Sequence, residues 1–478
     1  MGKMHNDTTL TVPELQERVP EYVVRLLAGC RVIEQWTGDD VVELASDESC
    51  WRLRKSSWEM IQRVKDEVAK LIAVPGIYPP FSVENVLTVY RQAAWVAKNM
   101  VKIPASKLRV LFPFEVDNGC AFYRTIQPFR FLEKLGDQTP IHAELVTDNP
   151  YNRICMAQLD NFDAVVVPRP SSNISQIMRD VITCGKVVIY ETDDLLTNLP
   201  DFNPQKMLIN PDDWHYALIA RAHGRIVSTE QLGEALAVTK HTYVVHNGID
   251  PTIWPMAVPA QPQGQPVRIL WAGGSTHSGD LNILRDVLPR LIKRFQSRVV
   301  FVFVGHLPEF LQAQGNPQCV TPGWQRHVQY APPVRIWEWP QYLAKAACHI
   351  ALAPLVKHPF NESKSELKVL EAWALGLPIV CSDIAPYKRA VTYGVDGFLV
   401  GDKYEEWEKT VADLVMDPKR RQEVGAAGLK SLESKGYLMP KIVLDYERAL
   451  LKICKGQVGR SECESAIEKR LAELEVAK

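Results

Sequence analysis

The most informative stretch of the sequence is Pro359-Phe-Asn-Glu-Ser-Lys-Ser-Glu-Leu-Lys-Val-Leu-Glu-Ala-Trp-Ala-Leu-Gly-Leu-Pro378. Ser363 followed three residues later by Glu366 fits a capping box, which predicts that a helix begins at this point. Gly376 and Pro378 end the helix. Because it follows a predicted strand, its N-terminus points into the cleft of an open sheet and offers free N–H groups to an anion.

Three charged residues of this helix, Lys364, Lys368 and Glu371, are spaced at i, i+4 and i+7 and lie within about 60° of one another on an ideal helix. Two ammonium groups near a helix N-terminus suit a diphosphate. A carboxylate one turn further in accepts hydrogen bonds from two vicinal ribose hydroxyls. The competing interpretation is a solvated helix face with salt bridges between residues three and four apart.

Short apolar strands and amphipathic helices alternate from Lys107 onward, a pattern typical of parallel sheets. Strands are predicted at 108–114, 162–167, 186–190, 224–228, 242–246, 267–271, 299–304, 349–353 and 378–382. Residues 255–266 are rich in Pro and Gln, which marks a linker. The fold class is therefore α/β, with two Rossmann-like parallel-sheet domains at 106–254 and 267–436 facing each other across a ligand cleft.

The two ends of the chain differ from this pattern. Residues 1–105 are predicted to form a mainly helical extension, with helices near 58–72 and 82–102, and residues 437–478 a charged helical tail. There is no apolar signal segment and no run of 18 apolar residues, so a cytoplasmic protein without a transmembrane segment is expected, in a bacterium or a phage-infected host cell. The ten cysteines contain no CxxC pair, which predicts neither disulfides nor a zinc site.

Three more loops carry polar groups after predicted strands. Gly273 and Gly274 follow one strand and let backbone N–H groups approach a phosphate, with His277 nearby, although His277 equally fits a surface helix cap. Asp117-Asn-Gly-Cys-Ala-Phe-Tyr-Arg124 follows the first strand, where Tyr123 and Arg124 otherwise simply start a helix. Glu191-Thr-Asp-Asp-Leu-Leu196 ends another strand, and its adjacent carboxylates are also a metal-ligand pattern or part of the loop structure.

The segment Glu371-Ala-Trp-Ala-Leu-Gly-Leu-Pro-Ile-Val-Cys-Ser382 resembles the donor-binding motif of retaining glycosyltransferases of family 4, group 1. It is closest to a subgroup with the pattern Phe-Asn-x-x-Lys-Ser-x-Leu-Lys-x-Leu-Glu. The resemblance implies the two-domain GT-B fold, with Glu371 on the nucleoside ribose and Lys364, Ser365 and Lys368 at the diphosphate. The family's E-x7-E pattern places its first Glu at Ser363, so Glu362 becomes the candidate for the carboxylate that contacts the donor sugar.

The same resemblance assigns the remaining loops. It places Gly273, Gly274 and His277 at the donor, and Gly119, Tyr123 and Arg124 near the acceptor. Asp193 and Asp194 would then meet acceptor hydroxyls. The predicted catalytic set, listed in full, is Glu362, Lys368 and Arg124. No metal and no cofactor are expected, because the helix dipole and lysines would neutralise the leaving diphosphate of a UDP- or GDP-type sugar nucleotide.

The function implied is transfer of a sugar from a nucleoside diphosphate sugar to an acceptor hydroxyl with retention, the acceptor being a glycan or a lipid-linked saccharide. One alternative is a phage-type glycosyltransferase that modifies a hydroxylated DNA base, against which the net charge of −1 counts. An alternative of another class is a non-catalytic nucleotide-sugar or glycan-binding module, which the missing first Glu permits.

Overall fold

The structure is a computed structural model that describes residues 31–37, 41–46, 49–54, 103–114, 118–147, 162–168, 181–182, 185–207, 219–236, 241–261, 264–314 and 316–476. Within the N-terminal extension, the described residues form an antiparallel sheet of β1 (Arg31–Thr37), β2 (Val41–Ser46) and β3 (Ser49–Arg54). The sequence analysis did not predict these strands. The two helices predicted near 58–72 and 82–102 lie outside the described residues.

The first α/β domain is built on a six-stranded sheet in the order β5-β4-β6-β7-β8-β9, with every neighbouring pair parallel. Its strands are β4 (Leu108–Phe114), β5 (Ile141–Thr147), β6 (Ala164–Pro168), β7 (Val187–Thr192), β8 (Gly224–Val227) and β9 (Thr242–Val244). Its helices are α5 (Gly119–Ala121), a π-helical turn (Phe122–Ile126), α6 (Gln127–Leu135) and α10 (Glu230–Ala235). The predicted helix from Tyr123 to Leu135 is confirmed, with a wider first turn.

The second α/β domain repeats the design with the order β14-β11-β10-β15-β16-β17, again entirely parallel. Its strands are β10 (Val267–Ala272), β11 (Val299–Val304), β14 (Val328–Ala331), β15 (Ile350–Ala353), β16 (Ile379–Ser382) and β17 (Phe398–Val400), and β12 (Gln312–Ala313) pairs with β13 (Asn316–Val320) in a separate hairpin. Its helices are α11 (Leu284–Phe295), α12 (Trp339–Lys345), α13 (Pro359–Glu362), α14 (Leu367–Ala374), α15 (Ala385–Ala390), α16 (Tyr404–Met416) and α17 (Pro418–Ser434).

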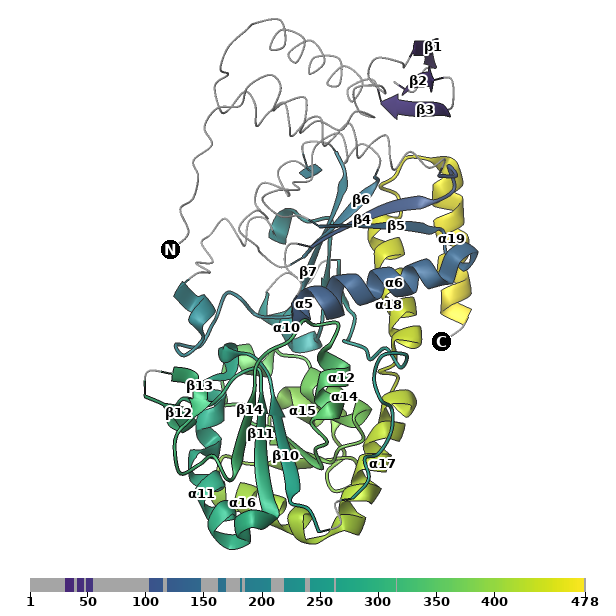
Figure 1. Ribbon diagram of the computed structural model, residues 1–478. Helices are drawn as coiled ribbons and strands as arrows, with labels where there is room; N and C mark the ends of the chain where they lie inside the picture. Colours follow the sequence, from purple (N-terminus) through teal and green to yellow (C-terminus); the bar gives the residue numbers. More distant parts are fainter. Residues whose placement is uncertain are drawn as a thin grey trace, which may run out of the picture.

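Both sheets are covered on two faces, as parallel sheets require. In the second domain α14, α15 and α17 contribute to one buried cluster around Trp373, while α11 and α16 cover the other face around Trp407. Figure 1 shows the two domains one above the other, with the ends of their strands turned toward the junction. This confirms the predicted pair of parallel-sheet domains.

The last two helices belong to the first domain, although they follow the second in sequence. α18 (Met439–Cys454) packs against α6, and α19 (Ser461–Val476) packs against α18. Their apolar residues share one buried cluster with β4, β6 and β7, and Figure 1 shows both helices rising beside that sheet. The segment predicted as a charged tail is therefore part of a domain core.

The chain crosses between the domains twice, and the two crossings run side by side. Ile249 and Leu438 form a parallel bridge, in which Ile249 N donates to Tyr437 O at 2.8 Å and Met439 N donates to Ile249 O at 2.9 Å. The described part of the Pro-rich segment, 255–261, lies on the second domain, because Met256 N donates to Ala374 O at 3.0 Å. The predicted linker thus begins a few residues after the actual crossing.

Candidate active site

A cavity of about 510 Å³ lies between the two domains and is walled by both. Its lining comes from segments that follow β4 and β7 in the first domain, and β10, β11, β14, β15 and β16 in the second. Because ligands of open parallel sheets bind at the carboxyl ends of strands, each domain presents its binding edge to the same space. Of the predicted site residues, the cavity is lined by Gly119, Tyr123, Asp193, Asp194, Gly273, Gly274, His277, Lys364, Ser365, Lys368 and Glu371.

The helix that carries the donor motif begins later than predicted. α14 starts at Leu367, and Ser363 is instead the C-cap residue that follows the short helix α13. The Ser363 hydroxyl donates to Pro359 O at 2.9 Å, and the Glu366 side chain faces Arg389 Nη2 at 3.3 Å, so the predicted capping box does not form. Lys364 therefore precedes the helix, while Lys368 and Glu371 lie within it.

Glu371 accepts a hydrogen bond from one side chain of each domain. Tyr123 in the first domain donates its hydroxyl to Glu371 Oε1 at 2.9 Å, and Trp339 Nε1 donates to the same oxygen at 3.1 Å. Burial raises the pKa of Glu371, while Lys368 and the two hydrogen bonds act in the opposite direction. Both donors converge on one oxygen of a nearly buried carboxylate.

Lys368 reaches from α14 to residues 273–279, the loop after β10 that is called the glycine loop below. Its ammonium donates to the carbonyl of Ala272, the last residue of β10, and lies 5.3 Å from the centre of the Trp271 ring. A Cβ on Gly273 would stand 2.6 Å from Lys368 Nζ, so this glycine makes room for the ammonium. Burial is the main reason that the pKa of Lys368 is lowered, and the nearby Lys364 adds to it. Two positive charges thus face one cavity.

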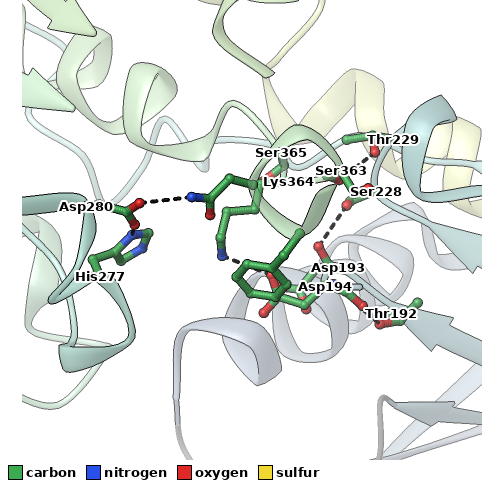
Figure 2. A network of polar contacts seen from close by, with 12 residues as sticks. Thr192, Asp193, Asp194, Ser228, Thr229, His277, Asp280, Ser363, Lys364 and Ser365 are labelled. Atoms are coloured by element: carbon green, nitrogen blue, oxygen red, sulfur yellow. Dashed lines mark hydrogen bonds and ion pairs between the residues drawn. The ribbon is translucent and has the colours of Figure 1, made fainter. Parts of the chain in front are cut away.

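Lys364 crosses the junction and pairs with the first domain. Its Nζ lies 3.0 Å from Asp194 Oδ1, and both side chains are mostly buried. Figure 2 shows this contact beside the Thr229 hydroxyl, which donates to Ser363 O at 2.8 Å. Ser365 Oγ accepts from Asn247 Nδ2 at 2.8 Å, so three successive residues of the motif are bound to the opposite domain.

His277 forms part of the wall behind the lysines. Its Nδ1 lies 2.8 Å from Asp280 Oδ2 (Figure 2). Asp280 Oδ1 accepts from Val356 N and from Asn361 Nδ2, each at 2.9 Å. Burial lowers the pKa of His277 to about 4. The imidazole is therefore neutral at physiological pH, and Asp280 orients it.

Two members of the predicted catalytic set do not line the cavity. Arg124 is 2% exposed, and its Nε lies 2.5 Å from Glu191 Oε1, while its Nη1 donates to Val245 O and to Asn247 Oδ1. Glu362 Oε2 accepts from Ala385 N at 2.9 Å, at the start of α15. Arg124 thus supports Asn247 and through it Ser365, and Glu362 caps a neighbouring helix.

One group of side chains in the described ranges has the spacing of metal ligands. It consists of Cys120, Asp193 and Asp194, whose ligand atoms lie within 4.8 Å of one another. The Lys364 ammonium already lies on Asp194.

Residues 266–417 match the family model described as glycosyl transferases group 1. They form a group 1 glycosyltransferase domain. With this domain the protein is a glycosyltransferase, and the predicted donor segment falls inside the matched range. No curated protein matches the chain.

Solved structures show that the glycosyltransferase shares its two-domain fold with others. A glycosyltransferase from Rickettsia africae ESF-5 is 12% identical with a TM-score of 0.51, over 73% of this chain and 99% of that one. Anabaena HepE, crystallised with UDP-glucose, is 15% identical with a TM-score of 0.50, over 72% of this chain and 100% of that one. These likenesses establish the GT-B fold. Among the helices of the described residues, none is both long and apolar enough to cross a bilayer.

Several cavity residues of the glycosyltransferase escaped the sequence analysis. Trp339 is the first residue of α12, which follows β14, an edge strand that the apolar pattern did not reveal. Asn203 and Gln205 lie at and within the 3₁₀ turn Pro204–Met207, after β7. The two tryptophans of Trp337-Glu-Trp339 were a sequence signal for a pocket residue in this segment, since aromatic residues are common in ligand pockets.

Proposed function

We propose that the protein transfers a sugar from a UDP- or GDP-type nucleoside diphosphate sugar to an acceptor hydroxyl, with retention at the anomeric carbon. The observation that carries this proposal is that Lys368 and Glu371, one turn apart on α14, face one interdomain cavity together with the glycine loop. The diphosphate would lie between Lys368 and Lys364, and the ribose hydroxyls would donate to Glu371.

The proposed chemistry is electrostatic. The leaving diphosphate gains negative charge as the glycosidic bond breaks, and two ammonium groups at the end of a helix stabilise that charge. Neutralisation by lysines makes the proposed reaction independent of a metal. Besides Glu371, the carboxylates that line the cavity are Asp193 and Asp194 of the first domain, and Asp194 is bound to Lys364. We therefore propose front-face attack by the acceptor hydroxyl without a covalent intermediate.

The donor half of the proposal is tested by nucleotide binding and turnover. UDP, GDP and their sugar esters are screened by thermal shift, where a bound ligand raises the unfolding temperature. Glu371→Ala and Lys368→Ala are expected to lower donor turnover by about 100-fold or more, as loss of groups that stabilise a transition-state charge does. Lys357→Ala is the matched control, because Lys357 is exposed and outside the cavity lining. Unchanged turnover in the first two variants would refute the donor site.

The non-catalytic alternative has one observation in its favour, since Ser363 replaces the first motif carboxylate and Glu362 is engaged by Ala385 N. A pure binding protein releases no nucleoside diphosphate, so release of UDP or GDP from the sugar ester decides between the two. The acceptor that we propose is a glycan or lipid-linked saccharide. A salt-sensitive shift of DNA containing hydroxylated bases would favour the DNA-modifying alternative instead.

A further inference from the structure

The loop after β7 reaches across the junction to the glycine loop. The ring of Phe202 packs on Gly279, where a Cβ would overlap it, and Ser278 Oγ donates to Phe202 O at 3.3 Å. The 3₁₀ turn Pro204–Met207 follows directly. Asn203 and Gln205 are thereby placed in the cavity wall, on the same segment of the first domain as Asp193 and Asp194.

Asn203 is 2% exposed, and its two amide ends differ in their contacts. Oδ1 accepts from Gln205 N at 2.9 Å. Across the part of the chain that the structure describes, the buried Nδ2 has no hydrogen-bond partner. The contact with Gln205 N fixes the orientation of the amide, because a flipped side chain would set its NH2 group against an N–H donor. Buried amide donors are almost always satisfied in native proteins, so this one calls for an explanation.

The neighbours of Asn203 in the cavity limit what its amide would bind. Asp193 and Asp194 accept hydrogen bonds, whereas the Asn203 NH2 group donates them. A hydroxyl is the group that accepts from an amide and donates to a carboxylate at the same time. Phosphate oxygens accept only, and two carboxylates on the same segment repel them. The wall is therefore complementary to a polyhydroxylated ligand.

We propose that Asn203 binds a sugar hydroxyl through its Nδ2 and, together with the carboxylates after β7, forms the carbohydrate subsite of the cavity. This proposal rests on the proposed function. Asn203 would contact the sugar in place of the motif carboxylate that is missing at Ser363. The hydroxyl comes from the donor sugar or from a saccharide acceptor, and the two sources are separated by the experiment.

Two variants test the subsite. Asn203→Asp keeps the oxygen that accepts from Gln205 N and replaces the donor by a second oxygen, while Asn203→Ser removes the amide without adding charge and still offers the turn an acceptor. Asn198→Asp is the matched control, since Asn198 is exposed on the same segment and outside the cavity lining. Thermal unfolding of each variant checks that the loop is intact.

Two measurements are made on the full chain: the dissociation constants of UDP, UDP-glucose, GDP and GDP-mannose, and the KM for glucose, maltose, lactose and N-acetylglucosamine as acceptors. Both Asn203 variants are expected to bind UDP and GDP within about twofold of wild type. A rise of about tenfold in the dissociation constant of a sugar ester places the hydroxyl on the donor, and the same rise in an acceptor KM places it on the acceptor.

No change in either measurement, or equal weakening of UDP and UDP-glucose, would overturn the subsite. A wild-type protein that binds none of the four nucleotides would instead refute the proposed function. The two failures are distinguishable, because the first appears as a difference between variants and the second in the wild-type protein alone.

Discussion

Lys364 and Asp194 meet across the domain junction, with 3.0 Å between Nζ and Oδ1, and their side chains are 16% and 15% exposed. One residue belongs to the motif that precedes α14 and the other to the loop after β7. The Asp194 carboxylate of the first domain is thus paired with the Lys364 ammonium, which the proposed diphosphate would bind. Donor binding would exchange one anion for another at the same amine, and it would release the loop of the first domain.

Asp194→Asn is expected to tighten binding of free UDP or GDP by about three- to tenfold, because the diphosphate no longer competes with a carboxylate for Lys364. Isothermal titration at low and high salt measures the effect, which should shrink as salt screens the charges. Asp201→Asn is the control, since Asp201 pairs with Lys206 outside the cavity lining. Weaker nucleotide binding in Asp194→Asn would show that this carboxylate supports the donor instead.

The pH range over which the protein binds nucleotide is expected to be narrower than it would be with an exposed carboxylate and an exposed lysine at the site. Burial raises the pKa of Glu371, so the carboxylate takes up its proton, and ribose binding declines, at a higher pH than for an exposed carboxyl. Burial lowers the pKa of Lys368, so its charge is lost, and diphosphate binding declines, at a lower pH than for an exposed lysine. Dissociation constants of UDP measured across pH test both limbs. In Glu371→Gln the acidic decline should disappear while the alkaline decline stays.

Arg124 is expected to stabilise the fold rather than to take part in the reaction. Its guanidinium is buried with Glu191, and removal of one member of a buried ion pair costs about 3–5 kcal/mol because the other charge is left unpaired. Arg124→Met should therefore lower the free energy of unfolding by about that amount in denaturant titration. Arg124→Met with Glu191→Leu removes both charges and should recover most of the loss. A stable, inactive Arg124→Met would restore the catalytic assignment.

Gly279→Ala is expected to disturb the contact between the domains, since the added Cβ would overlap the ring of Phe202. Overpacking of this kind costs about 1–3 kcal/mol, which lowers the midpoint of thermal unfolding by a few degrees. Gly274→Ala is the control for stability, because nothing lies within 4 Å of its Cβ position and its φ of −90° suits any residue. Equal midpoints for the two variants would argue that the loop after β7 moves freely.

The regular parts of the fold were predictable because their signals are local. Each of the nine predicted strands coincides with an observed one, since buried parallel strands such as Val299–Val304 are continuous apolar runs. In the two six-stranded sheets, the strands that were missed are β5, β14 and β17, and all three lie at sheet edges. In β5, His142 and Glu144 interrupt the apolar pattern. The predicted capping box was wrong because the Glu366 side chain pairs with Arg389 of α15, a partner that local sequence does not indicate.

The sequence by itself determined the two parallel-sheet domains, the glycine loop and the placement of Lys368 and Glu371 one turn apart, since hydrophobic periodicity and helical spacing are properties of neighbouring residues. Only the tertiary structure decided that Arg124 is buried with Glu191, that Glu362 caps α15, and that α18 and α19 complete the first domain. These outcomes depend on partners far away in the chain. Their contacts form only when the domains pack, because burial makes an unpaired charge or an exposed apolar face costly.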